Sequence, residues 1–228
     1  DLPIQMHIHE TAAEVSDSVA QYGKRPLARL RDLGLLSPRL IAVHMTQLTE
    51  EEMDWCAEAG VHIAHCPESN LKLASGFTPI AELIKRGVNV SIGTDGAASN
   101  NDLDMFAEMH QAAMLAKGVA GDPSVVPAYQ ALQMATINAA KSLGIDSITG
   151  SLEIGKAADI IAIDLSDIET QPFYDLPSQL VYATGRDKVS DAWVAGKQLL
   201  KQRQLTTMNT QHITAQAQQW ATKIRSVS

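Results

Sequence analysis

Histidine and carboxylate side chains stand at the ends of short apolar runs in this sequence, where they could bind a metal ion and move protons. His7 and His9 close the first run, and Glu10 follows directly. Because side chains alternate along a strand, the two imidazoles would share one face. A hydrolytic metal site needs imidazole nitrogens, carboxylate oxygens and a further carboxylate for proton transfer. His7, Glu10 and Asp95 would suffice, but one imidazole could instead line the pocket, or both could be ordinary polar strand ends.

Four short apolar, β-branched runs would form the strands that position these groups. Each run ends in a polar or ionisable residue, and helix-like segments lie between them. The runs cover residues 4–9, 40–44, 61–65 and 88–95. Alternating strands and helices predict parallel strands. In a (β/α)8 barrel the carboxyl ends of the strands carry the active site, so His44, His65 and Asp95 would meet the first histidine pair in one pocket.

Capping residues indicate where the helices between the strands begin and end. Thr49 followed by Glu52 predicts a capping box at a helix start, and Gly60 and Gly87 stand where helices would end. The helix-like segments cover residues 26–33, 49–58, 78–85, 103–117 and 127–143.

Two loops beside the strand ends carry groups that could contact a ligand. Asp95 is followed by Gly96, which would let the backbone pass close to whatever Asp95 binds. Residues 66–73 follow His65 and are rich in hydrogen-bonding groups, which could bind a substrate or form an ordinary connection.

A second, smaller β unit is predicted after residue 150. Residues 159–164 and 189–194 are strand-like, and residues 195–197 have the composition of a turn. Residues 210–224 place apolar side chains at helical spacing among polar ones, so they predict an amphipathic helix.

The composition favours a globular protein that acts on small molecules. Of the 228 residues 45% are hydrophobic and 19% are charged, which is ordinary for a folded domain. The formal net charge of -8 argues against nucleic acid or an anionic membrane as a partner. Two cysteines are too few for a disulfide framework, so we expect a reducing cytoplasm. No apolar stretch approaches the length of a membrane span.

Together, and in this order, the motifs of the chain resemble those of the amidohydrolase superfamily. Within it, they are most similar to the 5-methylthioadenosine/S-adenosylhomocysteine deaminases and to their triazine-hydrolase and guanine-deaminase relatives. The motifs that carry the resemblance are His7-Ile8-His9-Glu10-Thr11, Val43-His44, the stretch from His65 to Leu73, the stretch from Gly93 to Asn100, and the stretch from Gly150 to Asp159. The resemblance spans nearly the whole chain.

The resemblance implies an α/β fold. Residues 1–145 would form the C-terminal portion of a (β/α)8 TIM barrel, with strands 5 to 8. Residues 146–205 would form part of a small β-sandwich, and residues 206–228 a C-terminal helix. Dimers and tetramers are usual in the family, so the resemblance also implies a homo-oligomer.

By resemblance, the strand-end residues take distinct roles. His7 would bind the metal from strand 5, and Glu10 would shuttle protons. His44 would orient and polarise the attacking water, and His65 would lie in the pocket at the end of strand 7. Asp95 would bind the metal from strand 8 and accept the proton of the water. His7 and Asp95 are therefore the predicted metal ligands, and Glu10, His44 and Asp95 the predicted catalytic residues.

The predicted cofactor is one divalent metal, with Zn²⁺ placed first and Fe²⁺ or Mn²⁺ as alternatives, because imidazole and carboxylate suit all three. The expected reaction is hydrolytic deamination of an adenine-type nucleoside to the inosine analogue and ammonia. The predicted substrate contacts are His7, His9, Glu10, His65, Ser69 and Asn70.

One element of the family pattern, the His-x-His pair of strand 1, is not found. Too few residues precede His7-Ile8-His9 for it to be that pair, so the pair is expected upstream. Two predicted ligands are fewer than the three that a catalytic zinc site normally takes from protein. A chain that begins at Asp1 is therefore expected to bind metal weakly and to show no appreciable turnover.

Two other hypotheses remain open at this point. The same residues could serve a chlorotriazine hydrolase or a guanine deaminase, because Glu10 and Asp95 do not separate these reactions. Alternatively, the chain could be a truncated, non-catalytic piece that only folds or associates.

Overall fold

The computed structural model describes residues 2–226. The first residue of the predicted 1–145 segment and the last two of the predicted 206–228 segment lie outside these residues. The chain forms two compact units, one of Asp1–Lys156 with Ser166–Arg186 and the other of Ala157–Leu165 with Asp187–Ser228. The boundaries predicted after residues 145 and 205 stay predictions.

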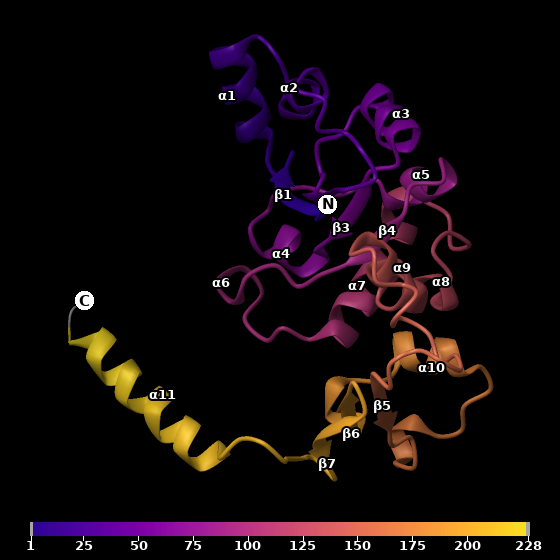
Figure 1. Cartoon of the computed structure of the whole chain (residues 1–228), viewed down its shortest axis with the longest axis vertical. Helices are drawn as coiled ribbons and strands as arrows, with labels where there is room; N and C mark the ends of the chain where they lie inside the picture. Colours follow the sequence, from indigo (N-terminus) through magenta and orange to yellow (C-terminus); the bar gives the residue numbers. More distant parts are fainter. Residues whose placement is uncertain (1, 227–228) are drawn as a thin grey trace. The chain divides into compact units, whose positions relative to one another are not determined.

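The first unit is built on a parallel four-stranded sheet in the order β1-β2-β3-β4. Figure 1 labels β1, β3 and β4 of this sheet. Its strands are β1 (Ile4–Ile8), β2 (Leu40–His44), β3 (His62–His65) and β4 (Val90–Ile92). The register places Ile8 beside His44 and His65 beside Ile92, so the carboxyl ends of the strands lie at the same edge. The predicted α/β class and parallel strands are confirmed.

Two strands of this sheet, β2 and β4, are buried on both faces, as expected for parallel strands covered by helices. All five residues of β2 and all three of β4 are buried. The core side chains include Ile8, Leu27, Leu40, Ile63 and Leu83, each 1% exposed or less. The apolar runs of the sequence therefore supply both the strands and the packing that holds them.

Helices connect and follow the strands of the first unit. They are α1 (Ala12–Tyr22), α2 (Pro26–Asp32), α3 (Glu50–Ala59), α4 (Pro67–Lys72), α5 (Ile80–Lys85), α6 (Ala97–Asn100), α7 (Met105–Ala120), α8 (Ala128–Met134), α9 (Ile137–Ser142), the 3-10 turn η1 (Ile168–Thr170) and α10 (Leu176–Tyr182). Thr49 and Glu52 form the predicted capping box, and Gly60 ends α3 in the left-handed conformation.

Three local features of this unit differ from the prediction. The strand expected over 88–95 is shorter, with only Val90–Ile92 paired. The helix expected over 127–143 is two helices, because Thr136 leaves the helical conformation with φ -128° and ψ -97°. Residues 66–73, taken as a loop, contain α4, whose first residue is Pro67. Proline favours that first position because its missing N–H has no partner there.

The second unit contains an antiparallel sheet in the order β5-β6-β7-β8. Its elements are β5 (Ile160–Ile163), η2 (Arg186–Lys188, which begins in the first unit), β6 (Val189–Val194), β7 (Lys197–Lys201), β8 (Gln204–Leu205) and α11 (Thr210–Arg225). The predicted turn between β6 and β7 and the predicted C-terminal helix are confirmed. No helix among the described residues is long and apolar enough to cross a membrane.

Candidate metal centre

Three side chains from three strand ends offer ligand atoms that all lie within 4.8 Å of one another: His7, His44 and Asp95. His7 Nε2 lies 3.6 Å from Asp95 Oδ1. The His7 and His44 rings meet edge to face, with centroids 4.7 Å apart and planes at 89°. Two imidazoles and a carboxylate are a donor set that suits zinc and other divalent transition metals. The parallel sheet thus brings together residues that are far apart in sequence.

His44 presents an unpaired nitrogen to this cluster. Its Nδ1 lies 2.8 Å from Oδ1 of Asn70, and because an amide oxygen only accepts, Nδ1 carries the proton. The orientation of that amide is supported by its nitrogen, which donates to Thr78 Oγ1 at 3.4 Å. The Nε2 of His44 is buried without a hydrogen-bond partner among the described residues. Its lone pair is therefore available to a metal ion or to a water hydrogen.

Asp95 is held by two serine hydroxyls that both bind the same oxygen. Ser69 of α4 and Ser99 of α6 donate to Oδ2 at 2.8 and 2.6 Å. Oδ1 is the oxygen that faces His7. Burial acts to raise the pKa of Asp95, but hydrogen bonds from Ser99 and Ser69 outweigh it, so the pKa lies below its ordinary value. The carboxylate is thus anionic and oriented for a cation.

Glu10 lies beside the cluster on a fixed backbone. Its Oε2 is 3.7 Å from His44 Nε2, and its Oε1 accepts from Ser75 Oγ at 3.4 Å. Its backbone N–H donates to the carboxylate of Glu14 at 2.6 Å, and its carbonyl accepts from Thr46 Oγ1 at 2.7 Å. A second carboxylate is therefore within reach of groups bound near His44.

His9 has contacts of a different kind. It is fully buried, and its Nε2 accepts from the backbone N–H of Leu27 at 3.1 Å, at the start of α2. Its Nδ1 lies 3.6 Å from Glu52, which also pairs with Arg25. Burial lowers the pKa of His9. These contacts tie β1 to α2 and α3, and the role of His9 as a substrate contact stays a prediction.

His65 at the end of β3 is a buried neutral imidazole. It is 3% exposed, and neither ring nitrogen has a hydrogen-bond partner among the described residues. Burial, and then repulsion by His44, lower the pKa of His65 to about 3. Its two nitrogens could bind a polar ligand or water, and its predicted contact with substrate stays a prediction.

Some residues that shape this site were assigned no role from the sequence. Ser99 lay within a recognised motif, but nothing in its spacing showed that it would bind Asp95. Glu14 had an available signal, since Thr11 and Glu14 have the spacing of a capping box. In the structure Thr11 caps α1, and the carboxylate of Glu14 accepts from the backbone N–H groups of His9 and Glu10 at the strand end.

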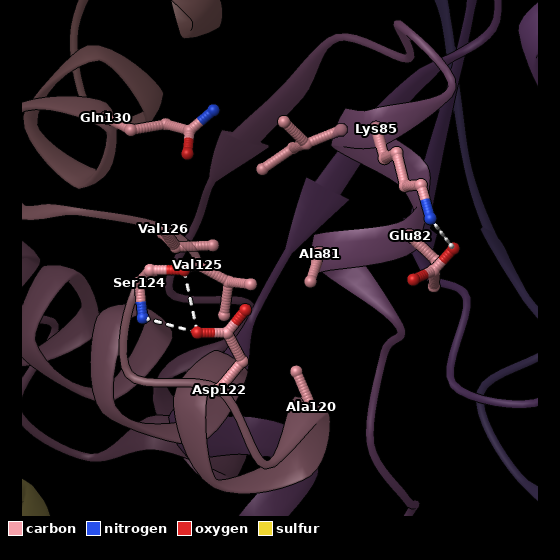
Figure 2. Close-up of a pocket in the computed structure, with 10 residues that line it drawn as sticks. Ala81, Glu82, Lys85, Ala120, Asp122, Ser124, Val125, Val126 and Gln130 are labelled. Atoms are coloured by element: carbon pink, nitrogen blue, oxygen red, sulfur yellow. Dashed lines mark hydrogen bonds and ion pairs between the residues drawn. The ribbon is translucent and has the colours of Figure 1, made fainter.

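A separate cavity of about 470 Å³ lies between α5, α8 and the loop after α7 (Figure 2). Its polar groups bind each other: Asp122 accepts from the N–H and hydroxyl of Ser124, and Lys85 lies 3.9 Å from Glu82. It shares no lining residue with the metal cluster. This cavity is therefore distinct from the cluster at the strand ends.

A model of the amidohydrolase family matches residues 1–199 of the chain. The 5-methylthioadenosine/S-adenosylhomocysteine deaminase of Teredinibacter turnerae is 52% identical over 221 residues, which are 97% of this chain and 50% of that protein. The chain thus spans about half the length of the curated relatives it matches.

Solved structures show the same similarity. A zinc-bound adenosine deaminase from Xanthomonas campestris has 57% identity and a TM-score of 0.96, over 98% of this chain and 51% of that one. An atrazine chlorohydrolase from Arthrobacter aurescens, complexed with zinc, has 29% identity and a TM-score of 0.88, over 95% of this chain and 48% of that one.

Proposed function

This chain belongs to the amidohydrolase family, and from that premise we propose that the protein is a metal-dependent hydrolytic deaminase of adenine-type nucleosides. The proposed substrates are 5-methylthioadenosine and S-adenosylhomocysteine, because several similar relatives are named as deaminases of these two compounds. The observation that carries the proposal is the cluster of His7, His44 and Asp95 with Glu10 beside it. We also propose that β1–β4 are strands 5 to 8 of a (β/α)8 barrel and that β5–β8 are part of a β-sandwich.

The cluster fits a divalent cation, and we propose zinc, which two structural neighbours contain. His7 Nε2 and Asp95 Oδ1 would hold it, because these two atoms face each other at 3.6 Å. Such a cation lowers the pKa of water from about 15.7 toward 7 and so supplies a nucleophile at neutral pH. His44 Nε2 would accept a hydrogen bond from the attacking water and set its direction.

The side chains then divide the proton transfers. Asp95 accepts the proton of the water as oxygen bonds to the ring carbon that carries the amino group. Glu10 protonates the adjacent ring nitrogen, which takes up the electron pair of the broken double bond. When the carbon–nitrogen bond breaks, Asp95 passes its proton to the leaving amino group. The hydroxyl on the ring carbon gives its proton back to Glu10 as it becomes the carbonyl. The products are the inosine analogue and ammonia, and water supplies the oxygen.

The test is to incubate the metal-loaded whole protein with methylthioadenosine and follow the ultraviolet change from adenine to hypoxanthine. We expect turnover, and we expect Asp95→Asn and Glu10→Gln each to lower it by about 10²–10⁴-fold, the usual contribution of a proton-transfer group. Asp122→Asn, outside the cluster, is the matched control and should keep full activity. Absence of the spectral change would contradict the proposed substrates.

A second candidate, chlorotriazine hydrolysis, rests on the structural likeness to the atrazine chlorohydrolase. Activity on a chlorotriazine or on guanine without activity on methylthioadenosine would favour it or a guanine deaminase. A whole protein that purifies without stoichiometric metal and is insensitive to Asp95→Asn would instead support a non-catalytic role. Three expectations stay predictions. They are the inactivity of a chain that begins at Asp1, the assembly of the protein into a homo-oligomer, and its cytoplasmic location.

A further inference from the structure

A buried carboxyl group outside the metal cluster joins three helices. Glu108 of α7 is 0% exposed. Its Oε1 accepts from the side-chain nitrogen of Asn100 at 2.7 Å, and its Oε2 accepts from the backbone N–H of Glu68 at 3.2 Å. Asn100 belongs to α6 and Glu68 to α4, so one carboxyl group connects both short helices to the long helix α7.

Asn100 makes this connection rigid because nearly all of its hydrogen-bonding capacity is used. Its amide nitrogen donates to Glu108 at 2.7 Å and to Glu68 Oε2 at 3.0 Å. Its amide oxygen accepts from the backbone N–H of Leu103 at 2.6 Å. A buried amide with both donors and its acceptor engaged has a single favourable orientation.

The two residues that Glu108 binds are direct neighbours of the two serines that hold Asp95. Glu68 precedes Ser69, and Asn100 follows Ser99. Both serine hydroxyls donate to Oδ2 of Asp95, and they come from α4 and α6 respectively. A shift of either helix against α7 would therefore displace a hydroxyl from Asp95.

We propose that Glu108 is a positioning residue that, by joining α4 and α6 to α7, holds the carboxylate of Asp95 in its metal-binding orientation. The proposal rests on the proposed function only where it takes Asp95 as a metal ligand. Glu108 itself has no contact with the metal cluster in this arrangement and acts through Ser69 and Ser99.

The electrostatic surroundings of Glu108 support a role for its hydrogen bonds rather than for its packing. Burial raises the pKa of Glu108 to about 8. The nearby charges of Glu68, Asp102 and Asp104 also raise this pKa, whereas the hydrogen bond from the backbone N–H of Glu68 lowers it. An ionisable group in such a place opposes folding near neutral pH, whereas an apolar side chain would not. Glu108 offsets this unfavourable effect through its hydrogen bonds to α4 and α6.

The test compares Glu108→Gln with the wild type in the whole protein. Glutamine keeps the volume, but its amide nitrogen only donates, so either Asn100 Nδ2 or the N–H of Glu68 loses the oxygen that it now binds. We expect the dissociation constant for Zn²⁺, measured by competition with a chelator, to rise about 10–100-fold, the usual effect of losing a group that orients a metal ligand. The absorption spectrum of the Co²⁺-substituted protein should change as well. Asn100→Ala breaks the same connection from the other side and serves if the first variant does not fold.

A double-mutant cycle separates positioning from general destabilisation. In a Ser69→Ala/Ser99→Ala background, Glu108→Gln should change the Zn²⁺ dissociation constant by less than about twofold, because its route to Asp95 is already broken. Equal effects in both backgrounds would overturn the proposal. Met134→Ala, a core substitution in α8, is the matched control: it should lower stability but leave the dissociation constant unchanged.

A metal-free readout keeps this proposal distinct from the proposed function. Hydrogen exchange of α4 and α6 in the metal-free protein should be faster in Glu108→Gln than in the wild type or in Met134→Ala. If the wild type binds no Zn²⁺, the proposed function fails and the exchange rates decide the positioning role. Unchanged exchange in both helices would contradict that role.

Discussion

Glu108 holds a proton more tightly in the folded chain than in the unfolded one, and this links stability to pH. Its pKa is about 8 when folded, against an ordinary 4.5. Below pH 4.5 both states carry the proton, whereas between about 4.5 and about 8 only the folded state does. The stability that this proton contributes is therefore full at the low end and is lost as the pH rises through about 8.

We expect the unfolding free energy of the metal-free protein to fall between pH 5 and pH 8 more steeply in the wild type than in Glu108→Gln, whose side chain does not titrate. Urea denaturation across this range measures the difference. Glu51→Gln removes an exposed glutamate of α3 and should keep the wild-type slope. Identical slopes for the wild type and Glu108→Gln would show that Glu108 has an ordinary proton affinity.

Residue types and spacing predicted that groups at several strand ends come together, but not what holds them. His44 and Asp95 were singled out because each ends a run apolar enough to be a buried strand, whereas His7 was chosen over His9 only by the resemblance to the amidohydrolases. Ser69 was predicted to contact substrate, and in the structure its hydroxyl binds Asp95. Such a bond joins α4 to the loop after β4, which is distant in sequence, and the spacing within either segment does not reveal it.

At the scale of secondary structure, the strand ends are turned by residues other than glycine. His9, His44 and Asp95 have φ values of 53°, 73° and 59°. The left-handed conformation costs an L-residue about 1–2 kcal/mol. The sequence pointed to Gly96 as the special backbone position, yet Gly96 has an ordinary φ of -79°. Tertiary packing therefore imposes part of this strain at residues of the candidate site, and other non-glycine residues away from it, such as Val126, also have positive φ.

The hairpin between β6 and β7 offers a stabilising substitution for the same reason. Ala195 and Gly196 have φ values of 49° and 77°, as in a two-residue turn in which both positions are left-handed. Asparagine tolerates this conformation better than alanine does, so Ala195→Asn should raise the unfolding free energy by about 0.5–1 kcal/mol. Chemical denaturation followed by circular dichroism measures the change.

Ala195→Val is the opposing control for this hairpin, since a β-branched residue is strained at positive φ. The hydrogen bond from the backbone N–H of Ala195 to Asp159 is independent of the side chain and should persist in both variants. A valine variant as stable as the asparagine variant would contradict this conformational argument.

Elements with strong local signals were predictable, and short or interrupted ones were not. The capping residues of α3 fixed its start and end within a residue, and the spacing of apolar residues identified α11. The six residues of α4 are too few for a periodic pattern. The break between α8 and α9 depends on Thr136, which sits in a sequence otherwise favourable to one continuous helix.

For the whole molecule, the separation of the cluster residues along the chain would couple the proposed metal binding to folding. His7, His44 and Asp95 come from the ends of three strands and meet only when the sheet has formed. An unfolded chain therefore lacks the site. A ligand that binds only the folded state stabilises it by about 2.7 kcal/mol at one hundred times its dissociation constant.

Removal of zinc from the protein by a chelator should therefore lower its melting temperature, by roughly 5–10 °C for a loss of that size. Differential scanning calorimetry with and without added Zn²⁺ measures the shift. Asp95→Asn should melt at nearly the same temperature in both conditions. An equal shift in that variant would mean that zinc binds elsewhere on the protein.

The same separation orders events during synthesis. A ribosome completes His7 and His44 well before Asp95, and each neighbouring pair of parallel strands must wait for the crossover between them. Contacts between residues distant in sequence form slowly. The nascent chain therefore passes through a period in which two imidazoles are present without their carboxylate. Under the proposed function, the complete cluster of His7, His44 and Asp95 can form only after Asp95 has left the ribosome.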